Sequence, residues 1–202
     1  MIRISDEVPD NGGIREPILW LRGDKVALGP FLRDLVPHYW RWETDPRTLL
    51  GYGQQYAETE QTRATVFDTQ TRDGSPYFTV YDLTGQVPTP VGTSQLIVDN
   101  RTRTGEFVIL LSEQGRGKGL AAEATRLTLD YGFHITALRN IYLSVVASNV
   151  AGIRAYEKAG FKMIGRRRNS AYWLGEIVDH VFMDAIPEDF PGPSAVRRLI
   201  EG

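Results

Sequence analysis

The chain has 202 residues, and 23 Lys and Arg residues against 25 Asp and Glu residues give it a formal net charge of −2. The length favours one globular domain, and the balanced charge argues against a general nucleic-acid binder, which usually carries a basic face. The absence of cysteine excludes disulfides, thiolate metal sites and a covalent cysteine intermediate. The three histidines match no metal-ligand spacing, so no metal is expected.

Targeting and membrane-spanning segments are not expected either. The first ten residues include three acids and lack the apolar stretch of a signal peptide. The longest apolar run, at 107–111, is far shorter than the roughly 18 residues that a membrane span needs. The default expectation is a soluble, cytoplasmic protein without a membrane partner.

The predicted elements alternate between strands and helices. Short apolar runs bounded by turn residues predict strands, and apolar residues at helical spacing predict helices. In chain order they are a strand at 18–28 with a turn at Gly23-Asp24, a helix from about 30 that breaks at Asp45-Pro46, a helix at 55–69, strands at 77–83, 91–98 and 106–111, a helix at 117–136, a strand at 141–146, a helix from Asn149 to Gly160, and strands near 162–168 and 177–184.

This order predicts an α+β fold with a mixed, mostly antiparallel central sheet flanked by helices. The three consecutive strands suggest an antiparallel meander, and the segment 106–146 is expected to form the one parallel β-α-β crossover. We expect the domain to cover residues 17–190, after a flexible N-terminal lead-in at 1–16 and before a C-terminal tail at 191–202.

A glycine-rich turn, Arg116-Gly117-Lys118-Gly119-Leu120-Ala121, lies between an apolar strand and an amphipathic helix. Glycines let a ligand approach the backbone closely, and the first amides of a helix are unpaired, so the turn suits a phosphate, helped by the two cations. The plainer alternative is a tight strand-to-helix turn. A Walker loop fails because Ser112 and Gly119 occupy the positions of its first glycine and its hydroxyl. A dinucleotide fingerprint through Gly117, Gly119 and Ala122 lacks the acid that should follow about 20 residues on.

The same turn resembles the (Q/R)-x-x-G-x-(G/A) motif of the GNAT superfamily of acyl-CoA-dependent N-acetyltransferases. A second segment, Asn149 to Phe161, is similar to that superfamily's N-x(6)-Y-E-K-x-G-F pattern. The stretches 105–109 and 179–183 resemble the branch of ribosomal-protein N-terminal and spermidine acetyltransferases. One departure is Gln114-Gly115, which stands where an acidic or aromatic pair is common, so the shape of that turn is in doubt.

The resemblance implies that acetyl-CoA is the co-substrate. Its pyrophosphate would lie on the amides of 117–122, and its pantetheine arm would pair like an extra strand. The cofactor-binding residues implied in this way are Ile109, Leu110, Leu111, Arg116, Gly117, Lys118, Gly119, Leu120, Ala121, Ala122, Asn149 and Tyr156.

Acetylation of an amine requires removal of a proton from the amine and stabilisation of the departing thiolate. The resemblance makes Tyr156 the candidate acid, against a plain core tyrosine. Asn149 is expected to cap a helix, and the resemblance adds a contact with pantetheine or an ordered water. Glu106 is the candidate base acting through water, against a solvated carboxylate at a strand end. Without cysteine, direct transfer in a ternary complex is favoured.

Substrate selection is expected from the first part of the chain, where aromatic residues alternate with charges. Aromatic faces and a carboxylate can hold a cationic amine, so Tyr39, Trp40, Trp42 and Glu43 are candidate substrate-binding residues. The alternative is a helix that packs its aromatic side chains on the sheet. The basic triplet Arg166-Arg167-Arg168 is interpreted as a solvated sheet edge, with contact to an acidic substrate as the alternative.

The sequence therefore predicts an N-acetyltransferase that moves an acetyl group from acetyl-CoA to a primary amine. The acceptor is left open between a protein N-terminus, a polyamine and an aminated small molecule or antibiotic. The alternative of another class is a non-catalytic acyl-CoA-binding sensor or partner module. No nucleic-acid partner is expected, and the oligomeric state is left open, a homodimer included.

Overall fold

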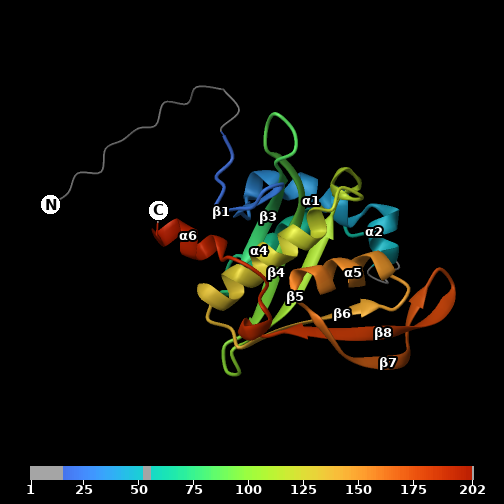
Figure 1. Ribbon diagram of the computed structural model, residues 1–202. Coiled ribbons are helices and arrows are strands. Elements are labelled where there is room, and N and C mark those ends of the chain that lie inside the picture. Colours follow the sequence, from blue (N-terminus) through green and yellow to red (C-terminus); the bar gives the residue numbers. More distant parts are fainter. Residues whose placement is uncertain (1–15, 52–55, 202) are drawn as a thin grey trace.

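The computed structural model describes residues 16–51 and 56–201, which build one eight-stranded sheet with helices on both faces (Figure 1). The strand order is β1-β2-β3-β4-β5-β6-β8-β7, and every neighbouring pair is antiparallel except β5 and β6. The strands are β1 (Leu21–Arg22), β2 (Val26–Pro30), β3 (Tyr77–Asp82), β4 (Thr89–Asp99), β5 (Thr104–Leu111), β6 (Asn140–Val146), β7 (Lys162–Trp173) and β8 (Glu176–Ala185). The predicted mixed sheet with one parallel pair is confirmed.

The helices are α1 (Val36–Glu43), α2 (Pro46–Gly51), α3 (Glu60–Gln70), α4 (Leu120–His134), α5 (Val150–Ala159) and α6 (Ala195–Glu201). Three of them, α1, α3 and α4, begin later than the sequence predicts, and for the first two the local reason is clear. A 3₁₀ turn precedes α1, and Pro37 stands in the first turn of that helix, where its missing N–H costs nothing. The start of α3 is set by Thr59, whose side chain accepts a hydrogen bond from the backbone of Thr62.

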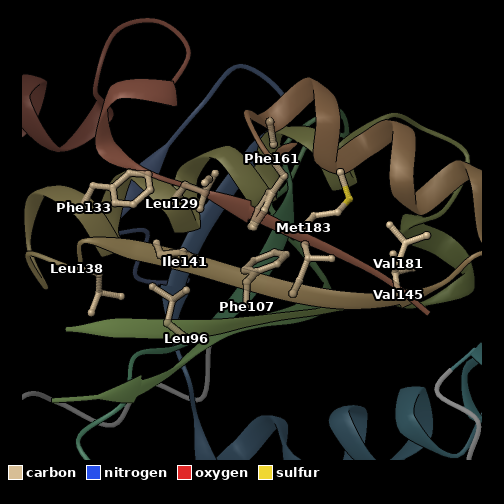
Figure 2. Close-up of a cluster of buried hydrophobic side chains, with 13 residues drawn as sticks. Leu96, Phe107, Leu129, Phe133, Leu138, Ile141, Val145, Phe161, Val181 and Met183 are labelled. Atoms are coloured by element: carbon tan, nitrogen blue, oxygen red, sulfur yellow. The ribbon is translucent and has the colours of Figure 1, made fainter. Parts of the chain in front are cut away.

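The main core lies between the sheet and helices α4 and α5 (Figure 2). Alternate residues of β5 divide between the two faces, because successive strand side chains point in opposite directions. Phe107 belongs to this core, whereas Val108 and Leu110 line a cavity on the other face, beside α1 and α3. On β8 the same alternation places Val181 in the core.

The parallel pair β5–β6 is short. Residues 104–106 pair with residues 140–142, and the two strands then separate, each held by its other neighbour. β5 stays paired with β4 as far as Leu111, and β6 stays paired with β8 as far as Val146. The sheet therefore opens into a fork between these two strands.

The C-terminal segment is tied to the domain by α6. Asp130 of α4 accepts hydrogen bonds from the hydroxyl of Ser194 and from the backbone amides of Ala195 and Val196. The domain boundaries at residues 17 and 190 remain predictions, and the expected lead-in falls almost wholly on residues 1–15, outside the described part of the chain. No helix in the described ranges combines the length and the apolar character needed to cross a lipid bilayer.

Candidate active site

The fork between β5 and β6 contains a cleft of about 920 Å³. One wall is β5 from Glu106 to Leu111, and the other is β6 from Leu143 to Val146. Arg116, Asn149 and Tyr156 also line it, so the two sequence motifs meet at this cleft although they are far apart in the chain. Because the cleft lies between two strands that no longer pair, it suits an extended ligand.

The glycine-rich turn stands at the open end of β5. Gly117 and Gly119 have φ of 74° and 77°, and a Cβ added at either position would meet nothing within 4 Å. Gly119 is the N-cap of α4 and offers no side chain to bond the amides of the first turn. The turn thus presents unobstructed backbone N–H groups at the positive end of a 15-residue helix, the geometry that binds a phosphate.

The two cations of this turn are held by the protein itself. Nζ of Lys118 lies 2.8 Å from Oδ2 of Asp82 on β3. Nε of Arg116 donates to the carbonyl of Leu111 at 2.9 Å, and its Nη2 donates to the hydroxyl of Thr48 at 2.5 Å. Both cations therefore fix the turn to β3, β5 and α2, and their expected contact with a phosphate remains a prediction.

Asp82, the partner of Lys118, is ionised because of the hydrogen bonds it accepts. Burial acts to raise the pKa of its carboxyl, but hydrogen bonds from Lys118 and Thr84 outweigh burial and hold the pKa below its usual range. The carboxylate is thus ionised at neutral pH.

Tyr156 forms part of the cleft wall on the side of α5. Its ring makes edge contacts with Phe107 and Phe161 at 6.1 Å each, and burial raises its pKa to about 12. At neutral pH the phenol is fully protonated and able to donate. The structure places the predicted acid in the cleft; its catalytic role remains a prediction.

Asn149 combines a structural and a lining position. Its Oδ1 accepts a hydrogen bond from the backbone N–H of Gly152 at 2.9 Å, which makes it the N-cap of α5 as expected. It also lines the cleft, so its amide group is available beside the route of the ligand.

Glu106 lies at the base of the fork, in the last residue pair that joins β5 to β6. Its charge contributes, after burial, to raising the pKa of Tyr142 across that pair. Because side chains alternate, Glu106 faces away from Phe107 and therefore away from α5.

A second, smaller cavity of about 290 Å³ lies between α1, α3 and the strands β4 and β5, and it shares Thr48, Val108 and Leu110 with the cleft. We call it the inner cavity. Glu43 lines it and forms an ion pair of 2.7 Å with the buried Arg63. Burial raises the pKa of Glu43 against the opposing effect of Arg63.

Of the four predicted substrate residues, two line the inner cavity and two do not. Trp40 lines the inner cavity with Glu43, and its indole donates to the carbonyl of Glu58 at 2.7 Å. Tyr39 is fully buried and bonded to Thr79, and Trp42 packs in the same aromatic cluster. Tyr39 and Trp42 line neither cavity, because their rings fill the space between α1, α3 and the sheet.

The hairpin β7–β8 also lines the cleft, and the sequence did not predict any cleft residue there. The hairpin supplies Asn169–Trp173, Ile177 and His180 to the cleft wall. The arginine triplet is on β7, an outer strand of the sheet, where Arg166 pairs with Asp179 at 2.6 Å. His180 belongs to the stretch 179–183 that resembles the GNAT branch, but its position in the cleft comes from the pairing of β8 with β6, where it lies opposite Val146. In the described part of the chain, no three His, Asp or Glu side chains converge as a metal site.

The strand fork, the α4 N-terminus without a side-chain cap and the buried phenol in the cleft wall together suit an acyl-CoA-dependent transferase. Comparisons with known proteins identify the family. Residues 25–162 match the sequence model of the family described as "Acetyltransferase (GNAT) domain". The chain belongs to the GNAT acetyltransferase family, and the predicted enzyme class is confirmed.

Relatives and solved structures agree with this assignment. The chain is 27% identical over 152 residues to the spermidine N(1)-acetyltransferase of Escherichia coli K12, which covers 75% of this chain and 80% of the relative. It is 33% identical over 101 residues to the "Probable N-acetyltransferase YjcK" of Bacillus subtilis, which covers 49% of this chain and 56% of the relative. The fold is similar, with a TM-score of 0.75 and 23% identity, to the Vibrio cholerae spermidine N-acetyltransferase solved in complex with CoA and spermine, over 82% of this chain and 97% of that one.

Proposed function

We propose that this protein transfers the acetyl group of acetyl-CoA to a primary amine of a polyamine. The observation that supports it most directly is the fork between β5 and β6, whose cleft is lined by Arg116, the residue before the glycines that lead to the uncapped N-terminus of α4. The choice of a polyamine acceptor is supported by the relatives named as spermidine acetyltransferases, one of which is matched over 80% of its length.

The donor half of the site follows from the glycine-rich turn. The pyrophosphate of acetyl-CoA would accept hydrogen bonds from amides within 117–122 and gain about 0.3–1 kcal/mol from the helix dipole. The pantetheine arm would follow β5 past Leu110 and Leu111 into the fork, where Asn149 and Tyr156 stand on the opposite wall. Arg116 and Lys118 hold the turn in place from behind, which spares the ligand the entropy of ordering it.

The chemistry is direct transfer. The amine nitrogen attacks the thioester carbonyl, the carbon–nitrogen bond forms, and the carbon–sulfur bond breaks with its electron pair on sulfur. Because burial holds the pKa of Tyr156 near 12, its phenol keeps its proton and can donate a hydrogen bond to the developing thiolate. Exclusion of water by Phe107 and Phe161 strengthens that hydrogen bond.

The acceptor half would use the α1–α3 side of the fork. An extended polyamine bound with its reactive amine at the thioester can reach the inner cavity past Thr48, Val108 and Leu110. There the carboxylates of Glu43 and Glu58 line the wall, and the carboxylate of Glu58 forms no ion pair within the described chain. A second ammonium group of the polyamine would be held by this negative charge.

An acceptor panel tests the proposal. Purified protein and acetyl-CoA are mixed with spermidine, spermine, an aminoglycoside or a short peptide with a free N-terminus, and release of the free thiol is followed. The highest kcat/KM is expected for spermidine or spermine. A higher kcat/KM for the aminoglycoside or the peptide would contradict the polyamine assignment, and no release with any amine would contradict amine acetylation.

A further inference from the structure

His180 is a cleft residue that neither motif includes. It pairs with Val146 on β6, at the wide end of the fork. Val181 and Met183, the first and third residues after it on β8, both belong to the main core. Strand alternation therefore puts the imidazole on the face away from α5. Tyr156 reaches the cleft from the donor side, and His180 reaches it from the acceptor side.

Ser170 on β7 holds one edge of the imidazole. Its hydroxyl oxygen lies 2.9 Å from Nδ1 of His180, 3.1 Å from the backbone nitrogen of His180 and 2.8 Å from the carbonyl of Arg167. The carbonyl can only accept, so the arrangement that makes all three contacts hydrogen bonds gives the hydroxyl proton to Arg167, while Nδ1 donates its own proton to Ser170. This tautomer leaves the lone pair of the imidazole on Nε2.

The groups around His180 leave that nitrogen free for a substrate. No hydrogen bond to Nε2 is formed by any residue in the described ranges. From β6, the neighbouring side chains on this face are those of Ser144 and Val146, which carry no charge. From β7, Arg167 lies directly across the ladder and covers the ring of Phe182, while the adjacent Asp179 is paired with Arg166.

Glu106, the base expected from the sequence, is placed differently. It is level with Tyr142, four residues along β6 from Val146, which corresponds to about 13 Å. The two candidate bases thus stand at opposite ends of the fork. An imidazole titrates close to neutral pH and suits proton removal from an amine better than a carboxylate does.

We propose that Nε2 of His180 accepts the proton of the attacking amine, directly or through one water molecule, and that Ser170 positions the ring for this step. The inference rests on the proposed amine acetylation. The nitrogen–carbon bond forms as the nitrogen–hydrogen bond breaks, the proton goes to Nε2, and the electron pair of the carbon–sulfur bond leaves on sulfur. The imidazolium then returns its proton to solvent.

The test compares His180→Gln with wild type, using the primary amine that wild type acetylates with the highest kcat/KM. We expect kcat to fall about 100-fold or more, with the dissociation constant for acetyl-CoA unchanged. The acid limb of the kcat/KM profile should move to higher pH and follow the ionisation of the amine, so the deficit should shrink toward about pH 10.

Two further comparisons separate catalysis from structure. Ser170→Ala should reduce kcat by a smaller factor and shift the acid limb, and Ser170→Thr, which keeps the hydroxyl, should restore both. His38→Gln is the matched control, since His38 is an exposed histidine on α1 and lines neither cavity.

If wild type is active and the His180→Gln variant keeps its rate and its pH profile, the role of His180 is overturned while the proposed function stands. A variant that loses acetyl-CoA affinity in step with its rate would overturn that role too, because the residue would then be structural. A wild type that acetylates no amine would overturn the proposed function and, with it, the role of His180.

Discussion

At the scale of single residues, the environment of a side chain decides which chemistry it can perform. Tyr156 lies against Phe107 and Phe161 in the cleft wall, and burial raises its pKa to about 12. A phenol in that environment acts as a hydrogen-bond donor and does not become a base in the physiological range. Lys118 differs from Tyr156, because its ammonium group already forms an ion pair with Asp82 within the protein.

Tyr156→Phe should lower kcat by about 100-fold and leave acetyl-CoA affinity within twofold of wild type, because the ring still packs and only the donor to sulfur is lost. Steady-state kinetics and calorimetry measure the two quantities. In wild type, no alkaline loss of rate from this phenol is expected below about pH 11. A variant with unchanged kcat would show that Tyr156 serves packing alone.

Lys118→Ala should make folding stability less sensitive to acid. The pKa of Asp82 is lowered in the folded state, so its contribution to stability is present above the unfolded value near 4 and is lost as pH falls through the folded value. Without Lys118 that contribution shrinks. Urea unfolding at pH 7 should show a loss of at most about 1 kcal/mol, because Lys118 is half exposed, and the gap to wild type should close toward pH 3. A gap that widens with acid would contradict this assignment.

At the scale of elements, the helices differ in how the backbone amides of their first turns are satisfied. The N-terminus of α4 is left open by Gly119, whereas the N-terminus of α5 is closed by Asn149. The short α6 begins at Ala195. The hydroxyl of Ser194 and the backbone amide of Ala195 donate hydrogen bonds to Asp130 in the middle of α4. An open N-terminus suits a ligand, and a closed one suits stability.

Gly119→Ala should weaken acetyl-CoA binding at least tenfold, because a side chain strains the left-handed turn and stands in front of its amides. Gly74→Ala is the matched control. Gly74 has φ of 78° and equally open surroundings, but it lies in the turn before β3, outside both cavities. Both variants should lose about 1 kcal/mol of stability, and only Gly119→Ala should change the calorimetric dissociation constant. Equal dissociation constants would place the phosphate elsewhere.

Asp130→Asn should destabilise the domain by about 1–3 kcal/mol, because the buried carboxylate accepts from Ser194, Ala195 and Val196 and also pairs with His134, and an amide cannot accept from all of them. Urea denaturation measures the change. Glu188→Gln, an exposed acid in the same C-terminal segment, should leave stability unchanged. Equal effects of the two substitutions would show that Asp130 does not hold α6.

At the scale of the whole molecule, the site exists because the sheet divides. The strands β1 to β5 form one ladder, the strands β6, β8 and β7 form another, and three residue pairs join them. The donor side of the resulting fork faces α4 and α5 (Figure 1), and the acceptor side faces α1, α3 and the β7–β8 hairpin. Each proposed role therefore depends on which face of which half a residue occupies.

The sequence by itself determined the features that depend on neighbours a few residues apart. The order of strands and helices, the glycine turn, the cap at Asn149 and the position of Tyr156 in its motif are all local patterns, because turn conformation, capping and periodicity act over short spans. These patterns were sufficient for the fold class and the family.

Only the tertiary structure decided which of those residues are free for a ligand. Asp82 forms an ion pair with Lys118, and Thr48 accepts a hydrogen bond from Arg116. Tyr39 is buried against the sheet, and the pairing of β6 with β8 places His180 at the fork. The partners in these contacts lie between 34 and 68 residues apart in the chain, as with Lys118 and Asp82 at 36 and Arg116 and Thr48 at 68. Hydrogen bonds and burial depend on distance in space, which spacing along the chain does not specify.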